Sequence, residues 1–479
     1  MFDADLQKFV NLGPMRVNRK TLGIIWAVIT VPVLSPLLLP QTLATPNTGY
    51  SRCDIELAVR TPGLTHIPEP PAGRIRIMPT RYSDLERASI GYEKTGVPLV
   101  AYDGRVFGPA GVIDDFGAYY FIPQIAARFG LSLRRSIDVF YMTLLVAAVG
   151  LGVFGCCLAL RTRIGKIYAI VELVLVSALA YRFGDVYILL AATVIAIAPL
   201  ALYVSGIPRP AITIPFVVGS GLVISIANAI RSHSGTGVLL FLLCLVLTRF
   251  AGGNYQKIVL ICMLLGVLVL PNLYFSRIVG QRDKFVRSQC PSYPKLSVKH
   301  VFWHAVYAGF GYLRNDEVAG YNDQVAYDKV QSIAPGTLYG SSGYEKVLRQ
   351  QVWLLVQLKP SLVLYTIASK LGVICAMFLL FANVGLIGAT IAPKPKGLEV
   401  AFWLGIVFDS LFGILVVPLM SYLLGLVAFA TLYGAVSLDL ALQKKLKQNI
   451  VRSLTARSAC PADTTTSRSP FVGRARKPL

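Results

Sequence analysis

Two adjacent acids, Asp114 and Asp115, stand in front of an aromatic stretch that ends at Pro123. A carboxylate can deprotonate a hydroxyl group, and a second carboxylate beside it can orient the first or shift its pKa. An aspartate before an apolar helical run can equally be an N-cap, which satisfies free amide groups of the first turn. The pair therefore predicts a general base acting on a hydroxyl, with a helix cap as the alternative for one aspartate. Asp115, which is nearer the helix start, is the better candidate for the cap.

Candidate cations for holding an anionic group occur in two later segments. Arg231 and His233 belong to a short Arg-Ser-His-Ser-Gly turn, a composition that can hold phosphate oxygens, although an arginine that caps a helix end would look the same. His300 and His304 are four residues apart and would share one helical face, but no glutamate of the HExxH type stands between them. We therefore predict phosphate contacts from Arg231, His233 and His304, and we do not expect a metal to be required; a divalent ion is the less favoured alternative.

Aromatic and amide side chains near these candidates could stack on and hydrogen-bond a sugar. Tyr119 and Tyr120 follow the acid pair, and Tyr312, Arg314 and Asn315 lie in a segment that mixes aromatic, amide and acidic residues. We predict these five residues as substrate contacts.

The elements that must position these residues are set by composition. The chain has 479 residues, of which 55% are hydrophobic and only 15% charged, so we expect a polytopic α-helical membrane protein. Runs of roughly 17 to 25 apolar residues can cross a hydrocarbon layer about 30 Å thick. We find about ten such runs, at 22–40, 137–160, 165–181, 186–205, 211–230, 237–250, 257–275, 371–392, 399–417 and 419–437.

Lysine and arginine gather in alternate short connections, which the positive-inside rule assigns to the cytoplasm. Both termini are then cytoplasmic, ten spans satisfy the parity, and two long segments face outward, as in a bacterial inner-membrane protein. We expect the first to hold a small mixed α/β lobe and an interface-lying helix over 119–128, and the second to end in interfacial helices over 344–370. The predicted boundaries are 1–21 (N-terminus), 22–40 (first span), 41–136 (first outer segment), 137–275 (spans two to seven), 276–370 (second outer segment), 371–437 (spans eight to ten) and 438–479 (basic tail).

Cys53 and Cys290 are the two cysteines expected outside, one in each long segment. In an oxidising compartment they predict a disulfide, with two unpaired thiols as the alternative. The net charge of +22 fits this topology and an attraction to anionic lipid headgroups rather than to nucleic acid. Nothing in the sequence gives the oligomeric state.

The pattern Asp114-Asp115-x-x-x-Tyr119-Tyr120-x-x-Pro123, a cytoplasmic N-terminus and two long outer segments separated by several spans resemble the membrane-integral GT-C glycosyltransferases. The stretch from Tyr344 through Lys359-Pro360 to Lys370 is also similar to the juxtamembrane segment of some members. The resemblance implies a polyprenyl-phosphate sugar as donor, a glycan or glycolipid hydroxyl as acceptor, inversion, no cofactor, and Asp114 or Asp115 as base. The chain departs from typical members in the roughly seventy residues between its first span and the acids.

Two other functions stay open. An O-antigen polymerase or ligase also uses polyprenyl-linked sugars, and it would make Arg231, His233 and His304 the primary residues and demote the aspartates. A lipid-linked glycan transporter would give roles to Glu172 and Asp409, the acids inside predicted spans. The two long outer segments and the lack of an internal repeat argue against the transporter.

Overall fold

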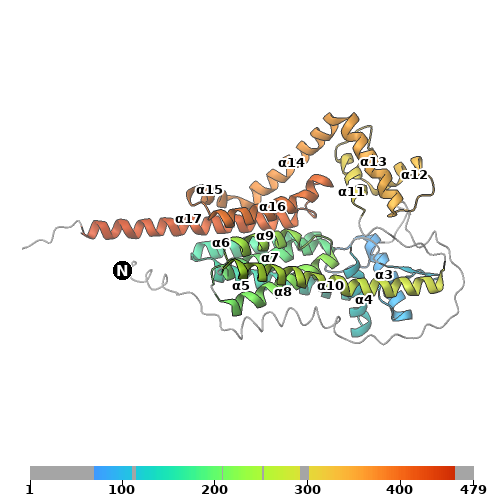
Figure 1. Cartoon of the computed structure of the whole chain (residues 1–479), viewed down its shortest axis with the longest axis horizontal. Helices are drawn as coiled ribbons and strands as arrows, with labels where there is room; N and C mark the ends of the chain where they lie inside the picture. The colour runs from blue at the N-terminus through green and yellow to red at the C-terminus, as the bar shows by residue number, and fades with distance from the viewer. Residues whose placement is uncertain (1–68, 111–114, 208, 251–252, 292–300, 459–479) are drawn as a thin grey trace, which may run out of the picture.

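The computed structural model describes residues 69–110, 115–207, 209–250, 253–291 and 301–458. In these ranges the chain forms a bundle of long apolar helices that carries two small lobes at one end (Figure 1). The bundle helices are α5 (Leu133–Ala159), α6 (Arg163–Phe183), α7 (Ile188–Ser205, preceded by the 3-10 turn η2, Asp185–Tyr187), α8 (Pro210–Ile230), α9 (Thr236–Thr248), α10 (Asn254–Gln289), α14 (Pro360–Ala382), α15 (Val384–Ile391), α16 (Lys396–Leu415) and α17 (Leu424–Ser458).

Eight helices in the described ranges are long and apolar enough to cross a membrane, which supports the prediction of a polytopic membrane protein. The run predicted at 237–250 forms α9, which has 13 residues. At 1.5 Å per residue it is about 20 Å long, shorter than a hydrocarbon layer of about 30 Å. The run predicted at 22–40 lies outside the described residues.

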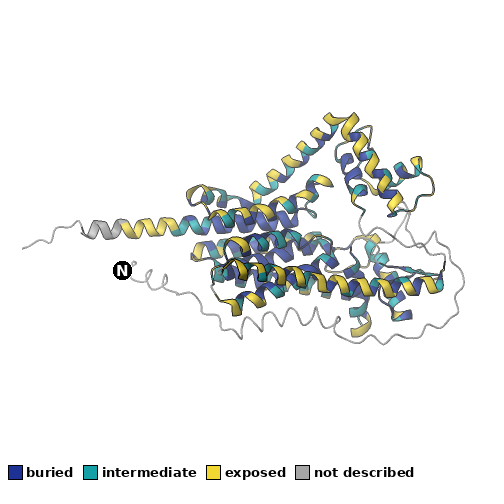
Figure 2. Ribbon diagram, in the orientation of Figure 1, coloured by how far each residue is buried: buried dark blue, intermediate teal, exposed yellow. Residues whose placement is uncertain are grey.

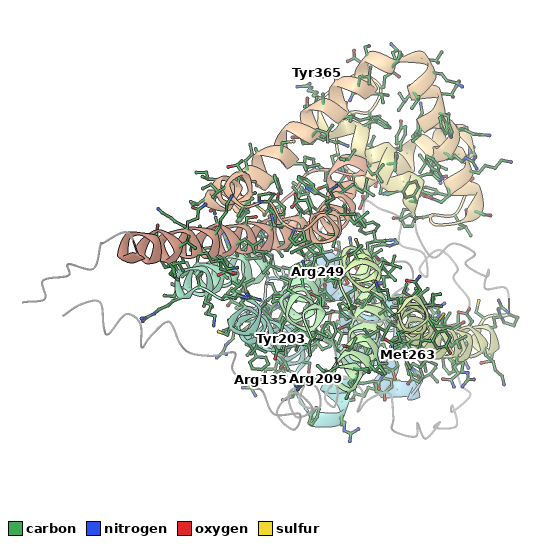
Figure 3. The ribbon with its side chains drawn as sticks, turned by 60° about the vertical axis from the view of Figure 1, so that its left-hand side comes forward. Arg135, Tyr203, Arg209, Arg249, Met263 and Tyr365 are labelled. Atoms are coloured by element: carbon green, nitrogen blue, oxygen red, sulfur yellow. The ribbon has the colours of Figure 1, made fainter. Side chains whose placement is uncertain are left out.

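The bundle has a buried centre and an apolar exterior. In α7 and α17, 89% of the most apolar window is buried, against 22% in α10 and α14 (Figure 2). Met263 on α10 and Tyr365 on α14 are 37% and 67% exposed, and Tyr365 projects away from the bundle (Figure 3). Long helices with exposed apolar faces suit contact with lipid. A helix satisfies its backbone hydrogen bonds internally, and its apolar side chains need no water.

The first lobe contains α3 (Pro79–Thr95), the strands β1 (Val100–Tyr102) and β2 (Phe107–Pro109), and α4 (Phe116–Phe129). The strands form an antiparallel pair in which Val100 lies opposite Pro109. Helix α4 covers the predicted interfacial segment, but its residues from Gly117 to Pro123 are all buried. It packs against α3, α5 and α8, so protein rather than lipid covers its apolar side chains.

The second lobe contains α11 (Phe302–Gly309), the 3-10 turn η3 (Phe310–Tyr312), α12 (Asp323–Ile333) and α13 (Ser342–Leu358). Pro360 then stands at the start of α14. Proline fits the first helical position because it has no amide hydrogen to leave unbonded. The segment predicted as interfacial, 344–370, is thus divided between α13 and the beginning of α14. Both lobes lie at the same end of the bundle (Figure 1).

Candidate functional site

Asp115 occupies the N-cap position of α4, but its side chain makes no capping hydrogen bond. Its Oδ2 lies 2.9 Å from Nη2 of Arg81, and its Oδ1 accepts a hydrogen bond from Nη1 of Arg231 at 3.1 Å. Only 7% of the residue is exposed. The cap interpretation of Asp115 is therefore wrong, because its carboxylate is committed to two guanidinium groups. Asp114 lies outside the described residues, and its role stays a prediction.

Arg81 connects Asp115 to a second buried acid. Its Nη1 lies 3.3 Å from Oδ1 of Asp185, a residue that is 1% exposed and also accepts the backbone N–H of Val186 at 2.8 Å. Burial alone would lower the pKa of Arg81, but the carboxylates of Asp115 and Asp185 outweigh it and raise that pKa above the ordinary arginine value. With Arg231, the cluster holds two positive and two negative groups and is formally neutral.

Arg231 reaches Asp115 because α8 and α4 approach closely. Gly117 lies two residues after Asp115, and a Cβ added there would stand 2.8 Å from backbone atoms of Ala229 and Ile230, directly before Arg231. Only glycine permits that approach without moving one of the helices. Arg231 itself is the C-cap residue of α8, as the helix-end alternative predicted, and its side chain turns to the acid cluster.

A line of tyrosines leads from this cluster to the second lobe. The guanidinium carbon of Arg231 lies 5.2 Å from the ring centre of Tyr187. The hydroxyl of Tyr187 is 3.5 Å from that of Tyr422, which is 3.4 Å from that of Tyr321. Burial, followed by the neighbouring Tyr321, raises the pKa of Tyr422 to about 12, so this hydroxyl stays protonated at neutral pH. These loose contacts place the second lobe beside the acid cluster.

His304 is a bonded core residue of the second lobe. Its Nδ1 lies 2.7 Å from the hydroxyl of Tyr344, its Nε2 lies 3.1 Å from Oδ1 of Asp323, and only 3% of it is exposed. The hydrogen bond from His304 lowers the pKa of Asp323. Glu345 of α13 accepts the backbone N–H groups of Trp303 and His304 at the start of α11. Both ring nitrogens of His304 thus hold α11, α12 and α13 together, and neither is left for a donor phosphate.

His233 is exposed and lies in the same turn as Arg231, with a φ of 65°. Its ring centre lies 5.8 Å from that of Phe412 and 6.4 Å from that of Phe408, both on α16. It therefore packs over α16 next to the cluster. His300 lies outside the described residues. In the ranges that the structure describes, no three His, Cys, Asp or Glu residues are arranged to hold a metal.

The two predicted tyrosine contacts of α4 are buried. Tyr120 is fully buried, and its hydroxyl lies 2.5 Å from that of Tyr274 within a cluster of aromatic rings. Tyr119 is 9% exposed, and burial raises its pKa, while the nearby charge of Arg81 opposes that rise. Tyr120 is therefore a packing residue, whereas Tyr119 borders the acid cluster.

In the second lobe, the amide of Asn315 is used within its own loop. It donates to the carbonyl groups of Phe310 and Leu313 at 2.9 and 2.7 Å, and its oxygen accepts the N–H groups of residues 317 and 318. Arg314 is exposed and Tyr312 is half-buried. Of the three predicted sugar contacts here, Arg314 and Tyr312 keep accessible surface, and Asn315 shapes the loop that carries them.

Cys290 ends α10 and is disulfide-bonded. Its predicted partner, Cys53, lies outside the described residues, so the pairing between them stays a prediction. The described cysteines with free thiols are Cys156, Cys157, Cys244, Cys262 and Cys375.

Arg81 and Asp185 were not predicted from the sequence. One signal was present, because Asp185 is an acid that stands directly before a predicted span and follows Gly184. Charged groups at such positions are expensive to bury and need a partner. No comparable signal marked Arg81, since nothing in its neighbourhood shows which face of α3 packs on the bundle.

No family model and no curated protein sequence matches the chain. Among solved structures, the chain aligns with the crystal structure of ArnT from Cupriavidus metallidurans in the apo state. The alignment covers 77% of this chain and 72% of that chain, with 12% sequence identity and a TM-score of 0.35. A similarity of this size is too weak to carry an argument about function.

Proposed function

We propose that this chain is a membrane glycosyltransferase of the GT-C type, which moves a sugar from a polyprenyl-phosphate donor to an acceptor hydroxyl with inversion. The observation that carries the proposal is the carboxylate of Asp115, held between Arg81 and Arg231 at the end of the bundle where both lobes lie. By the charge pattern of the connections, this end faces away from the cytoplasm.

The proposed step joins the acceptor oxygen to the anomeric carbon from the face opposite the phosphate. The bond from that carbon to the phosphate oxygen breaks, and its electron pair leaves with the polyprenyl phosphate. The hydroxyl proton passes to an aspartate, Asp115 or its neighbour Asp114. Arg81 and Arg231 hold the carboxylate of Asp115 in place through ion pairs at 2.9 and 3.1 Å. Guanidinium groups also stabilise negative charge of the kind that grows on a leaving phosphate.

The competing functions find less support. A polymerase or ligase would use Arg231, His233 and His304 together, but both ring nitrogens of His304 are bonded inside the second lobe. A transporter would need exchangeable intramembrane acids. Glu172 accepts a hydrogen bond from the amide of Asn383 at 3.0 Å, so it has a partner in the helices around it.

The test is donor turnover by the full-length chain in vesicles, measured as release of polyprenyl phosphate from a panel of polyprenyl-phosphate sugars. General-base catalysis contributes about 10² to 10⁴-fold, so Asp115→Asn should lower kcat at least a hundredfold if Asp115 is the base. Arg231→Ala should mainly raise the KM of the donor. Asp84→Asn is the matched control, because it removes an ion-paired aspartate of the same lobe whose partner is Arg87.

The outcomes separate the candidates. Loss of turnover in Asp114→Asn, with Asp115→Asn active, would move the base to Asp114 within the same function. Full activity in both, with loss in Arg231→Ala and His233→Ala, would support the polymerase or ligase function. A wild-type chain that consumes none of the donors would contradict the proposal.

A further inference from the structure

A basic site apart from the Asp115 cluster lies where the segment before α3 crosses the ends of α5 and α6. A cavity of about 330 Å³ is lined there by four arginines: Arg74, Arg76, Arg134 and Arg182. Within the described ranges, no ion pair or hydrogen bond engages the side chains of Arg74, Arg76 or Arg182. Arg134 lies 3.4 Å from Asp138, which is the one acid among the described residues that pairs with the group. The cavity therefore carries a positive excess that is suited to an anion.

The segment that brings Arg74 and Arg76 to the cavity is firmly held. Ile75 is fully buried, and the carboxylate of Asp138 accepts the backbone N–H groups of Arg74 and Ile75 at 3.0 and 2.8 Å. A guanidinium nitrogen of Arg134 donates to the carbonyl of Ile75, while its buried Nε has no hydrogen-bond partner among the described residues. The backbone that carries Arg74 and Arg76 is thus in place before a ligand arrives, which lowers part of the ordering cost of binding.

The surface below the cavity is apolar along its whole length. Exposed residues follow one face of α6 at spacings of three or four, and they end at Tyr181, which also lines the cavity. They are Ile164, Ile167, Val171, Val174, Ala178 and Tyr181, and the five larger side chains are exposed by 63, 53, 52, 51 and 40%. A helix of 21 residues is about 32 Å long, enough to cross a hydrocarbon layer of about 30 Å. Tyrosine and arginine at its end are typical of the membrane–water interface.

We propose that this cavity binds the phosphate of an anionic phospholipid from the surrounding leaflet, whose acyl chains lie along α6. A free anion would use the arginines but would have no use for the apolar stripe that leads to them. None of the lining residues belongs to the Asp115 cluster, so the proposal stands apart from the glycosyltransferase function. The held segment continues directly into α3, so a bound headgroup would steady the helix that carries Arg81.

The test is native mass spectrometry of the purified full-length chain, titrated with phosphatidylglycerol and, separately, with phosphatidylcholine. A basic side chain near a membrane surface contributes about 1 kcal/mol to binding of anionic lipid, which corresponds to roughly fivefold in affinity. The variant Arg74→Ala/Arg76→Ala/Arg182→Ala should therefore weaken retention of phosphatidylglycerol on the order of a hundredfold. Phosphatidylcholine retention should be weak in both proteins. All three side chains are exposed, so the variant should fold.

The matched control is Arg128→Ala/Arg135→Ala/Arg287→Ala. It also removes three exposed arginines, but none of these lines the cavity. It should retain phosphatidylglycerol as the wild type does. Equal losses in the two triple variants, or none in the first, would overturn the proposal. Displacement of the lipid by inorganic phosphate would assign the cavity to a soluble anion. Preferential retention of polyprenyl phosphate would assign it to the donor lipid.

Discussion

Arg81→Ala should be among the most damaging single changes in the first lobe. The Arg81 side chain is 13% exposed, and the two carboxylates that it bridges are 8% (Asp115) and 2% (Asp185) exposed. After its removal Asp115 keeps Arg231, whereas Asp185 keeps no cation and only backbone N–H donors among the described residues, those of Val186 at 2.8 Å and of Met78. The cost should thus come mainly from an uncompensated charge at Asp185.

Breaking a buried ion pair by removal of one partner costs about 3–5 kcal/mol, because the other charge is left without compensation. We expect about 3 kcal/mol here, since Asp115 retains a second arginine. The double variant Arg81→Ala/Asp185→Asn removes the orphaned charge as well and should recover about 1–2 kcal/mol of that loss. A coupling of this sign and size would show that the two residues stabilise the fold through each other.

The measurement is thermal unfolding of the purified chain in detergent, with activity followed in parallel. Arg87→Ala is the matched control, because Arg87 lies on the same helix and pairs with Asp84 at 2.6 Å, but the two side chains are 25% and 34% exposed. Exposed pairs contribute about 0–1 kcal/mol. If Arg81→Ala unfolds no more readily than Arg87→Ala, the acid cluster does not hold α3 on the bundle, and Arg81 does not compensate the buried charge of Asp185.

Two further predictions concern the other end of the bundle and the approach of α4 to α8. Burial lowers the pKa of Lys394 from 10.5 to about 8, and Glu399 partly opposes this effect. The buried charge therefore destabilises the folded state fully below pH 8, and the destabilisation disappears as the pH approaches 10.5. Thermal stability should rise over that range, and Lys394→Met should flatten the rise; an unchanged slope would contradict this. Gly117→Ala should push α4 from α8, lengthen the 3.1 Å contact between Asp115 and Arg231, and cost about 1–3 kcal/mol. Gly150→Ala, where an added Cβ inside α5 meets nothing within 4 Å, should stabilise the chain by up to about 1 kcal/mol and leave turnover unchanged.

The bundle could be predicted from the sequence because crossing a membrane constrains a long run of residues at once. Eight of the predicted apolar runs overlap helices long enough to span, including α6 and α16. The predicted runs failed where length mattered, as at α9, because hydropathy marks an apolar segment without fixing where its helix begins and ends. The junction at Pro360 was also misplaced, although proline at a first helical position was visible in the sequence.

The candidate site was less predictable, because a residue type shows which bonds a side chain can make and not which bonds it already has. His304 and Asn315 have the right chemistry for phosphate and sugar, but partners in their own lobe occupy them. Asp115 looked suited to a helix cap, and a partner 34 positions earlier in the chain, Arg81, took its carboxylate instead. Local pattern favoured the cap, and tertiary contact decided against it.

Glycine residues give some information on tertiary contacts that the local sequence pattern does not show. Gly117 follows the acid pair inside a helical stretch, where glycine costs about 1 kcal/mol relative to alanine. Such a residue needs a compensating reason, and here the reason is the backbone of Ala229 and Ile230, which leads to Arg231. A glycine next to a candidate acid therefore indicates that another element packs against that position. The glycine alone does not identify Arg231 as the partner. It does distinguish an acid at a tightly packed helix junction from an acid on a solvated surface, and this distinction supports a functional role for Asp115.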